Sequence, residues 1–405
     1  MSRVCVVGLG YMGLPMAAIL AKSGHEVIGV DINPRVIERV NKGECPFAET
    51  GMPELVAEAH ESGRLRAVAK PEAAEIFILS LPTPVDHVTH EADMSYVEAG
   101  AKSIAAVLRG GELVVLESTS PIGATRKNVK DAIETLRPEL KDKVDYVFCP
   151  ERAIPGNTLK EMVGNDRLVG GLTPQATVRA MALYKTFCTG ALLEATTEEA
   201  EMVKLVENAS RDAQIAFANE LSLVCDKLRL DVWKVIALAN HHPRVNILNP
   251  GAGVGGHCIA VDPWFIINSA PEITPVMRAV RGVNDHKPLW VAGQVEKASA
   301  GLGRKAIVAC LGLAYKPDVD DLRESPSITV VHELAKQGFD VRVVEPHLQA
   351  WEMPLHTLEE AVSAADVVVT LTGHKAFQAL GQGALSGKKL VDAAGIYRGR
   401  TDNLA

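Results

Sequence analysis

The chain has 405 residues, which exceeds the size at which a single hydrophobic core usually stops growing, so we expect two or three domains. Hydrophobic residues make up 47% of the chain, charged residues 23% and aromatic residues only 4%, which is typical of a globular α/β protein and excludes a disordered or fibrous one. The formal charge of −8 and the lack of a Lys/Arg run argue against a nucleic-acid-binding surface.

The N-terminal segment enters an apolar strand at once, without the basic and cleavable regions of a secretory signal. No apolar run reaches the ~18 residues that a transmembrane helix needs. The seven cysteines are scattered, without C-x-x-C pairs or zinc-ligand spacing. We therefore expect reduced thiols and a cytoplasmic protein.

The first motif lies at residues 8–13, where G-L-G-Y-M-G follows a β-branched run and precedes a helix-forming segment. In such a unit the first glycine permits a tight turn, the second lets the backbone approach a pyrophosphate, and the third allows the helix to pack closely on the strand. Asp31 follows the next apolar strand, residues 26–30, where an acidic partner of the ribose hydroxyls is expected. The combination predicts a dinucleotide site, and the carboxylate favours NAD over NADP.

Further apolar strands are expected at residues 76–81, 113–116 and 144–148, each followed by polar residues. Ligands of doubly wound sheets lie beyond the carboxyl ends of the strands, so Thr83 and Thr119 are expected to point toward the cofactor. The alternative for both is turn and cap chemistry. Glu151 follows the third of these strands and is a candidate general base, or else a surface partner of Arg152.

The middle of the chain contains neither Gly nor Pro from residue 191 to residue 242, which predicts helix. We expect a long helix from the Thr196 region to about Leu228, and a second helix capped by Asp231 and running through Asn240. Lys204, Asn208 and Arg211 lie at i, i+4 and i+7 of the long helix and therefore share one face. A solvated polar face is the alternative to a functional one.

A glycine-rich segment at residues 250–263, P-G-A-G-V-G-G-H-C-I-A-V-D-P, is centred on Cys258. Four glycines within six residues clear side chains from a loop, so that backbone N–H groups and a thiol can approach a ligand. The alternative is a turn with a small buried cysteine. His257 and Cys258 are adjacent and have poor metal-ligand spacing, so no metal is expected. Two adjacent histidines, the second of which is His242, precede Arg244 and the loop. Their imidazoles and the guanidinium of Arg244 could hold a phosphate.

The last third repeats the strand and helix alternation, with strands expected at residues 305–311, 340–345 and 366–371 and a helix at 327–337. Glu345 ends its strand as Asp31 does, but G-x-G-x-x-G is absent, so we expect a nucleotide of another kind there. Lys316 and Arg323 are candidate phosphate ligands, or surface partners of the nearby acidic run. The predicted fold class is α/β, with two Rossmann-like doubly wound domains joined by a long central helix.

Seven segments carry a family resemblance over nearly the whole chain. They are G-L-G-Y-M-G-L-P at 8–15, P-T-P at 82–84, E-S-T-S-P-I-G-A-T at 117–125, C-P-E-R-A-I-P-G at 149–156, the helix with Lys204 and Asn208, P-G-A-G-V-G-G-H-C at 250–258, and G-L-A-Y-K-P-D with D-L-R-E-S-P at 312–326. In this order and spacing they resemble the UDP-glucose/GDP-mannose dehydrogenase family.

Within that family, three segments most resemble the members that oxidise UDP-N-acetyl-D-mannosamine: C-P-E-R-A-I-P-G, S-R-D-A-Q-I-A-F-A-N-E-L-S from Ser210, and N-H-H-P-R-V-N-I-L from Asn240. UDP-glucose dehydrogenases usually carry a second Glu where this chain has Pro155, which speaks against UDP-glucose. The resemblance implies domains at residues 1–190 (NAD-binding Rossmann domain), 191–297 (central helical dimerisation region with the Cys258 loop) and 298–405 (UDP-sugar-binding Rossmann-like domain).

The activity implied by the resemblance is a four-electron oxidation of the sugar C6 to a carboxylate by two NAD⁺ in succession, giving UDP-N-acetyl-D-mannosaminuronate. Cys258 would form first a thiohemiacetal and then a thioester. Lys204 and Asn208 would stabilise the developing oxyanion, and Lys204 would also handle the first proton. Glu151 would act as the base for water, with Asp262 supporting the thiol or the water network and Thr119 orienting the water or the nicotinamide.

The resemblance also implies two sets of binding residues. The NAD set is Gly8, Gly10, Tyr11, Met12, Gly13, Asp31, Thr83, Thr119 and Arg323. The UDP-sugar set is Arg152, Ala153, Lys204, Asn208, Arg211, His242, Arg244, Gly255, Tyr315 and Lys316. A homodimer built on the long helix is expected, with Arg244 serving the neighbouring subunit's site.

Three other functions stay open from the sequence. One is oxidation of UDP-N-acetylglucosamine or another nucleotide sugar, because the residues do not fix the stereochemistry at C2. A second is an ordinary two-electron sugar-alcohol dehydrogenase, which would leave Cys258 without a task. The third is an NAD-binding regulatory scaffold, which would have no reason to combine a thiol, an ammonium, an amide and a carboxylate. Oxidation of UDP-N-acetyl-D-mannosamine would supply an aminouronic acid for polysaccharide biosynthesis.

Overall fold

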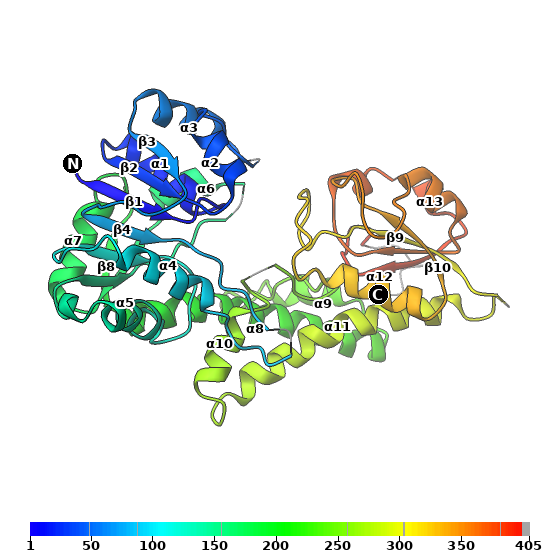
Figure 1. Ribbon diagram of the computed structural model, residues 1–405. Helices are drawn as coiled ribbons and strands as arrows, with labels where there is room; N and C mark the ends of the chain where they lie inside the picture. The colour runs from blue at the N-terminus through cyan, green and yellow to red at the C-terminus, as the bar shows by residue number, and fades with distance from the viewer. Residues whose placement is uncertain are drawn as a thin grey trace. The chain divides into compact units, whose positions relative to one another are not determined.

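The computed structural model describes residues 1–398 apart from 48, 87, 155, 257, 303 and 381 (Figure 1). Pro155 and His257, which entered the sequence analysis, lie outside the described residues. The chain forms two compact units. The first comprises Met1–Val206 and Trp264–Ser269, and the second comprises Glu207–Pro263 and Ala270–Ala405.

In the first unit, eight strands within the described residues form one sheet in the order β3-β2-β1-β4-β5-β6-β7-β8. The strands are β1 (Arg3–Val7), β2 (Glu26–Val30), β3 (Leu65–Val68), β4 (Ile76–Leu79), β5 (Leu113–Leu116), β6 (Asp145–Phe148), β7 (Arg167–Gly171) and β8 (Leu192–Thr196). All neighbours are parallel except β6 and β7. The first six strands have the order of a dinucleotide-binding sheet, and the order reverses between β1 and β4, where such sheets bind their ligand.

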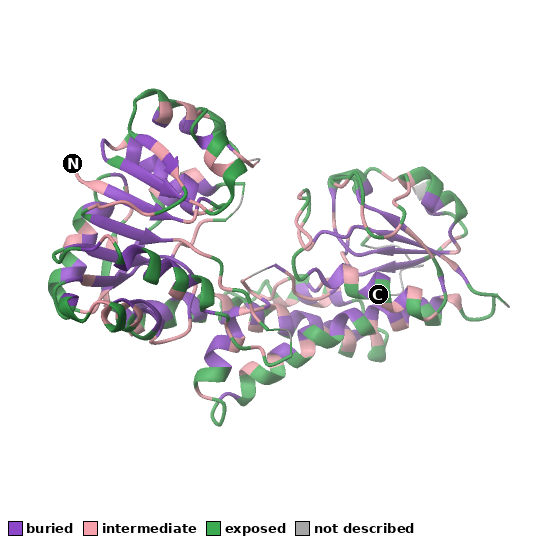
Figure 2. Ribbon diagram, viewed as in Figure 1, coloured by how far each residue is buried: buried purple, intermediate pink, exposed green. Residues whose placement is uncertain are grey.

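Helices cover both faces of this sheet. They are α1 (Gly13–Lys22), α2 (Pro34–Val40), α3 (Met52–Glu61), α4 (Ser95–Ala105), α5 (Asp131–Leu136), α6 (Thr158–Gly164) and α7 (Pro174–Tyr184), with a π-helical turn at Thr125–Lys130. Val4 and Val6 of β1 belong to the core with α1 and α3, whereas Cys5 and Val7 belong to the core with α4 and α5. A strand buried on both faces requires the continuous apolar runs that the sequence shows. Figure 2 shows β1 and β4 as buried accordingly.

The long helix predicted from the sequence is confirmed as α8 (Thr197–Leu228), which has 32 residues. The second predicted helix is α9 (Val232–Ala239), and Asp231 caps it by accepting hydrogen bonds from the N–H groups of Trp233 and Lys234. Two more helices follow, α10 (Asp262–Ser269) and α11 (Pro275–Ser299). None of the described helices is both long and apolar enough to cross a membrane.

The second sheet has the order β10-β9-β11-β12, and all its neighbouring strands are parallel. Its elements are β9 (Ile307–Leu311), β10 (Asp340–Val344), β11 (Val367–Thr370) and β12 (Lys389–Asp392), with α12 (Pro326–Lys336), α13 (Leu358–Ala364) and α14 (Lys375–Gln378). The order again reverses beside its first strand. Two Rossmann-like units and a long helix are therefore confirmed, as the sequence predicted.

Buried polar side chains join α8 to α11 in the second unit. Asp212 Oδ1 is 2.7 Å from Arg281 Nη1 and accepts a hydrogen bond from Asn284 Nδ2. Asn219 donates to Asn284 Oδ1 over 2.8 Å, and its own Oδ1 accepts from the N–H of Gly251 over 2.9 Å. Each of these side chains has at least one partner, although Oδ2 of Asp212 and Nε of Arg281 are buried without a hydrogen bond among the described residues. The network holds the start of the Cys258 loop against α8.

Candidate active site

Three glycines after β1 show three different roles. Gly8 has a φ of 96°, and a Cβ there would lie 2.1 Å from the carbonyl oxygen of Ser80. A Cβ at Gly13 would lie 1.9 Å from the carbonyl oxygen of Gly8, whereas a Cβ at Gly10 would have no described heavy atom within 4 Å. The first and third glycines therefore serve the turn and the packing of α1, and the backbone at Gly10 is open to a ligand.

Asp31 stands at the end of β2, next to this turn. Its Oδ2 accepts a hydrogen bond from the N–H of Leu9 over 2.9 Å, and its Oδ1 accepts from the N–H of Asn33 over 2.8 Å. The residue is only half-buried, so the carboxylate remains within reach of ribose hydroxyls. The first turn of α1 holds no acidic side chain, and its N–H groups favour a phosphate. These residues fit an NAD molecule.

The remaining NAD candidates of the first unit border the same sheet edge. Thr83 and Thr119 are half-buried and follow β4 and β5, which are neighbours in the sheet. Met12 packs against the core, and Tyr11, which is 52% exposed, lies with its ring centroid 4.4 Å from that of Phe47. Arg323 belongs to the second unit, where it forms an ion pair with Asp321.

Glu151 follows β6 and is not a surface residue, because its side chain is only 9% exposed. Its Oε2 is 2.7 Å from Nη2 of Arg167 on β7, and its Oε1 accepts hydrogen bonds from the backbone N–H groups of Arg152 and Ala153. Glu151 is therefore largely buried beside Arg167, and its role as a base stays a prediction. Arg167 was not among the residues predicted from the sequence, and the antiparallel pairing of β6 and β7 brings it to Glu151.

The loop before Cys258 packs closely against the segment that follows β9. A Cβ at Gly255 would lie 2.6 Å from Cβ of Tyr315, and one at Gly256 would lie 3.0 Å from Cε2 of the same ring. The N–H of Gly256 donates to the carbonyl oxygen of Arg323 over 2.9 Å. These glycines are thus required by the close approach of two chain segments, and the approach fixes where the half-buried Cys258 emerges.

Three of the candidate catalytic residues are joined directly. The N–H of Asp262 donates to the carbonyl oxygen of Cys258 over 2.8 Å, at the first turn of α10. Asn208 Nδ2 donates to Asp262 Oδ2 over 2.5 Å, and Asp262 is only 2% exposed. Lys204 lies one turn before Asn208 on α8 and is 8% exposed. The helical spacing predicted for Lys204, Asn208 and Arg211 is confirmed, and along that face the residues change from buried to exposed.

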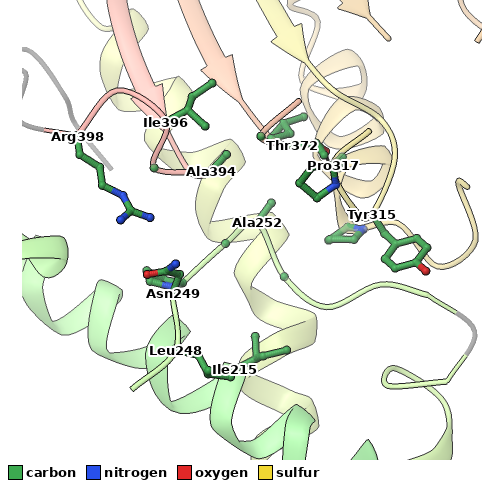
Figure 3. Close-up of a pocket in the computed structure, with 18 of the residues that line it drawn as sticks. Ile215, Leu248, Asn249, Ala252, Tyr315, Pro317, Thr372, Ala394, Ile396 and Arg398 are labelled. Atoms are coloured by element: carbon green, nitrogen blue, oxygen red, sulfur yellow. Dashed lines mark hydrogen bonds between the residues drawn. The ribbon is translucent and has the colours of Figure 1, made fainter. Parts of the chain in front are cut away.

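A cavity of about 880 Å³ opens in the second unit beyond the carboxyl ends of β9, β11 and β12. Figure 3 shows Arg398 and Asn249 on one side and Tyr315 on the other, with the segment of Ala252 between them. The polar and charged residues of its lining are Arg211, Asn249, Tyr315, Ser327, Thr372, Gln378 and Arg398. Arg211 and Tyr315 were predicted, and Lys316 lies between the lining residues Tyr315 and Pro317. The other five were missed, although Thr372 follows the end of a predicted strand.

Of the predicted substrate residues in the second unit, Arg211 and Tyr315 line this cavity, whereas Asn208, His242, Arg244, Gly255 and Lys316 do not. His242 and Arg244 are exposed on the turn after α9, where the N–H of Arg244 donates to Nδ1 of His242. Nothing in the single chain assigns these two residues a ligand.

In the second unit, the carboxylate that corresponds to Asp31 is that of Glu345, and neighbouring residues occupy it with hydrogen bonds. Glu345 is 4% exposed, and its Oε2 accepts hydrogen bonds from the N–H groups of Leu313 and Ala314, while Oε1 accepts from the N–H of His347. Nε2 of His374 lies 3.1 Å from the same Oε2, and its Nδ1 accepts from the N–H of Asp318. Asp318, His347 and His374 could approach a metal ion, but both ring nitrogens of His374 are already engaged.

One Rossmann-like unit contains the glycine turn with Asp31. The other contains a thiol loop beside a nucleotide-sized cavity. Together these features define an NAD-dependent dehydrogenase. The chain belongs to the UDP-glucose/GDP-mannose dehydrogenase family. The family's NAD binding domain matches residues 2–188, its central domain residues 198–286, and its UDP binding domain residues 309–399.

Relatives extend over almost the full chain. A UDP-N-acetyl-D-mannosamine dehydrogenase of Yersinia pestis is 45% identical over 98% of this chain and 99% of its own. An NDP-N-acetyl-D-galactosaminuronic acid dehydrogenase of Ralstonia nicotianae is 45% identical over 97% of this chain and 96% of its own. The structure of a UDP-D-ManNAc dehydrogenase from Pyrococcus horikoshii superposes with a TM-score of 0.90 at 34% identity, covering 98% of this chain and 96% of that one.

Proposed function

We propose that the protein oxidises the C6 hydroxymethyl group of UDP-N-acetyl-D-mannosamine to a carboxylate, with two NAD⁺ consumed per sugar. The observation that carries the proposal is the link from Asn208 through Asp262 to Cys258, which places an amide, a buried carboxylate and a thiol around one loop. The likeness to UDP-N-acetyl-D-mannosamine dehydrogenases supports the choice of sugar.

Each residue has a task in this reaction. Bound NAD⁺ supplies the hydride acceptor for both oxidations. Cys258, as a thiolate, adds to the carbon of the C6 aldehyde and holds it as a thiohemiacetal, which becomes a thioester after the second oxidation. The ammonium of Lys204 and the amide of Asn208 stabilise the negative oxygen, and Asp262 orients that amide. Glu151 takes the proton from the water that hydrolyses the thioester.

The binding residues divide between two ligands. Gly8, Gly10, Gly13 and Asp31 hold NAD, with Tyr11, Met12, Thr83 and Thr119 beside them and Arg323 reaching its pyrophosphate. The UDP part of the substrate occupies the cavity lined by Arg211 and Tyr315, with Lys316 and Gly255 next to it. Arg152 and Ala153 contact the sugar part.

A second sugar has support of its own. The relative from Ralstonia nicotianae is as identical to this chain as the one from Yersinia pestis, and its name refers to N-acetyl-D-galactosaminuronic acid. The galacto and manno sugars differ in the orientation of ring substituents, which a cavity distinguishes by shape. UDP-N-acetyl-D-galactosamine is therefore the competing substrate.

Counting NADH tests the proposal. With limiting UDP-N-acetyl-D-mannosamine and excess NAD⁺, we expect two NADH per sugar. One NADH per sugar indicates a simple dehydrogenase, and none indicates a scaffold. Cys258→Ser is expected to abolish carboxylate formation while NAD still binds, and unimpaired turnover of this variant would overturn the role of the thiol. A parallel series with the galacto and gluco N-acetylhexosamines and UDP-glucose ranks the sugars.

The assembly we propose is a homodimer on α8. Large apolar side chains are exposed along this helix, with exposed fractions of 39% at Val203, 43% at Val206, 59% at Phe217, 46% at Val224 and 60% at Leu228. Their spacing of three, four or seven residues, with one longer gap, keeps them near one stripe, and a stripe of this kind is commonly covered by a partner. Arg244 would then serve the neighbouring subunit's site.

We place the reaction in the cytoplasm. All seven cysteines are free thiols, as a reducing compartment requires, and the reaction consumes NAD⁺ and a nucleotide sugar. The product, a nucleotide-linked aminouronic acid, is a building block for polysaccharide biosynthesis.

A further inference from the structure

A buried ion cluster lies beyond the carboxyl ends of β5 and β6 in the first unit. Arg167 opens β7, and its side chain is 4% exposed. Its Nη2 lies 2.7 Å from Oε2 of Glu151, and its Nη1 lies 3.9 Å from Oε1 of Glu117. Glu117 directly follows β5, and its side chain is fully buried. One guanidinium therefore serves two carboxylates.

The surroundings fix the guanidinium of Arg167 in place. Its Cζ lies 4.9 Å from the ring centroid of Tyr184 and 5.4 Å from that of Phe187. The hydroxyl of Tyr184 donates to Oε1 of Glu117 over 2.7 Å. The other carboxylate oxygen of Glu117 is buried without a hydrogen-bond partner among the described residues. The guanidinium of Arg167 is thus held between two carboxylates, and one oxygen of Glu117 lacks a hydrogen bond within the described part of the chain. In such a buried cluster, a change of charge on one group strongly alters the electrostatic energy of the others.

The two carboxylates are not equivalent. Glu151 receives three donors, one from Arg167 and two from the backbone, whereas Glu117 receives one hydrogen bond from the described residues, that of Tyr184. Burial raises the pKa of Glu117 to about 7, an effect that Arg167 opposes and Glu151 reinforces. Protonation of Glu117 thus removes one negative charge from beside the single positive charge of Arg167.

We propose that Arg167 and Glu117 are positioning residues for hydrolysis of the thioester: Arg167 orients Glu151, and the charge of Glu117 sets how strongly Arg167 holds it. This inference rests on the proposed function, in which Glu151 is the base. In that step the oxygen of water bonds to the thioester carbon and a proton of the water passes to Glu151. The carbon–sulfur bond breaks, and its electron pair leaves on the sulfur of Cys258.

The direction of the effect follows from the charges. While Glu117 is neutral, the full charge of Arg167 acts on Glu151 and opposes the transfer of a proton from water. Once Glu117 ionises, it draws on the same guanidinium, so Arg167 opposes that transfer less strongly. Hydrolysis should therefore accelerate as the pH rises through the pKa of Glu117.

The other groups facing Glu117 do not produce this change. They are Arg167 on β7, Glu151 and Cys149 after β6, and Tyr184 on α7. Burial raises the pKa of the Cys149 thiol and of the Tyr184 phenol, so both stay neutral near neutral pH. Arg167 stays charged, because Glu151 holds its pKa above the usual value even though burial opposes this.

Glu117→Gln tests the proposal, because glutamine keeps the shape of the side chain and removes its titration. The enzyme is mixed with NAD⁺ and UDP-N-acetyl-D-mannosamine and quenched at successive times, and the decay of the sugar adduct on Cys258 is followed by intact-protein mass spectrometry. In the wild type we expect the decay rate to rise about tenfold from about pH 6 to about pH 8. In Glu117→Gln the rate should stay at its low-pH value.

Glu112→Gln is the matched control. Glu112 is also buried and directly precedes β5, but it caps the backbone N–H groups of Arg109 and Gly110. This variant should keep the wild-type rise.

Tyr184→Phe provides a second test, which holds even if Glu117→Gln fails to fold. It removes a donor that stabilises the charged form of Glu117, so the rise in the decay rate should move to higher pH. A wild-type rise in Glu117→Gln, or an unmoved rise in Tyr184→Phe, would overturn the proposal. A wild type that forms neither adduct nor NADH would overturn the proposed function as well, which distinguishes the two failures.

Discussion

Asn208 donates a hydrogen bond to the carboxylate of Asp262 over 2.5 Å, although the two residues are 54 positions apart in the chain. The bond joins the middle of α8 to the first residue of α10, and the N–H of Asp262 binds the carbonyl oxygen of Cys258. The position of the thiol is therefore set by a helix that lies far from it in the sequence.

Replacing Asp262 with Asn tests this link. The variant leaves the amide of Asn208 without its charged acceptor, so its donor is no longer held toward the developing oxyanion. We expect kcat to fall about 100-fold, with the affinity for NAD unchanged. Steady-state kinetics and NAD titration measure the two effects. Asn268→Ala is the control, because Asn268 lies on the same helix and donates to the carbonyl oxygen of His90. An equal loss in both variants would contradict the prediction.

Gly255→Ala should disturb the cavity wall. A Cβ there would lie 2.6 Å from Cβ of Tyr315 and 2.7 Å from the carbonyl oxygen of Glu324, so one of two chain segments must move. We expect the affinity for UDP to fall about tenfold, measured by calorimetry. Gly282→Ala is the control, because its Cβ would meet no described heavy atom within 4 Å and it lies in α11. That variant should gain about 1 kcal/mol of stability. Unchanged UDP binding in Gly255→Ala would show that the wall adapts.

Phe217→Asp should weaken the proposed dimer. The ring is 59% exposed on α8, and a charge in a buried interface is costly. We expect a shift from dimer to monomer in analytical ultracentrifugation at micromolar concentration. Val178→Asp on α7 replaces an apolar residue of similar exposure, 61%, away from the stripe. If both variants remain dimeric, α8 is not the interface.

Lys287→Met should stabilise the protein near neutral pH. Lys287 is 3% exposed, its Nζ donates to Ser222 over 2.6 Å, and burial lowers its pKa to about 7. Between about pH 7 and about pH 10 the unfolded chain therefore binds more protons than the folded one, and wild-type stability rises with pH in that window. The variant loses this rise and gains about 1 to 2 kcal/mol near pH 7.

Urea unfolding at about pH 7 and about pH 9 measures both effects. Lys297→Met is the control, because Lys297 lies on the same helix with its side chain 68% exposed. A pH-dependent rise that survives in Lys287→Met would rule out Lys287 as its source.

The features that the sequence predicted well are local in the chain. The glycine turn and Asp31 follow consecutive strands of one unit, and α8 needs only an uninterrupted run without Gly or Pro. Their geometry depends on the backbone within a few tens of residues, which sequence patterns record.

What the sequence could not show depends on pairing at long range. Arg167 reaches Glu151 only because β7 runs antiparallel to β6, and no pattern marks that reversal. Thr372 and Arg398 meet Arg211 at one cavity because β11 and β12 end beside it. Arg323 forms an ion pair with Asp321, two positions before it, and its role as a phosphate ligand stays a prediction.

The buried carboxylate of Glu345 makes the second unit a poor site for a dinucleotide. Both Asp31 and Glu345 accept backbone N–H groups, but Asp31 is half-buried, whereas Glu345 is buried and also lies against His374. A dinucleotide finds no matching acceptor there, so a rising pool of NAD saturates one unit without crowding the other. NAD and the nucleotide sugar can thus bind the same chain without competing for one site.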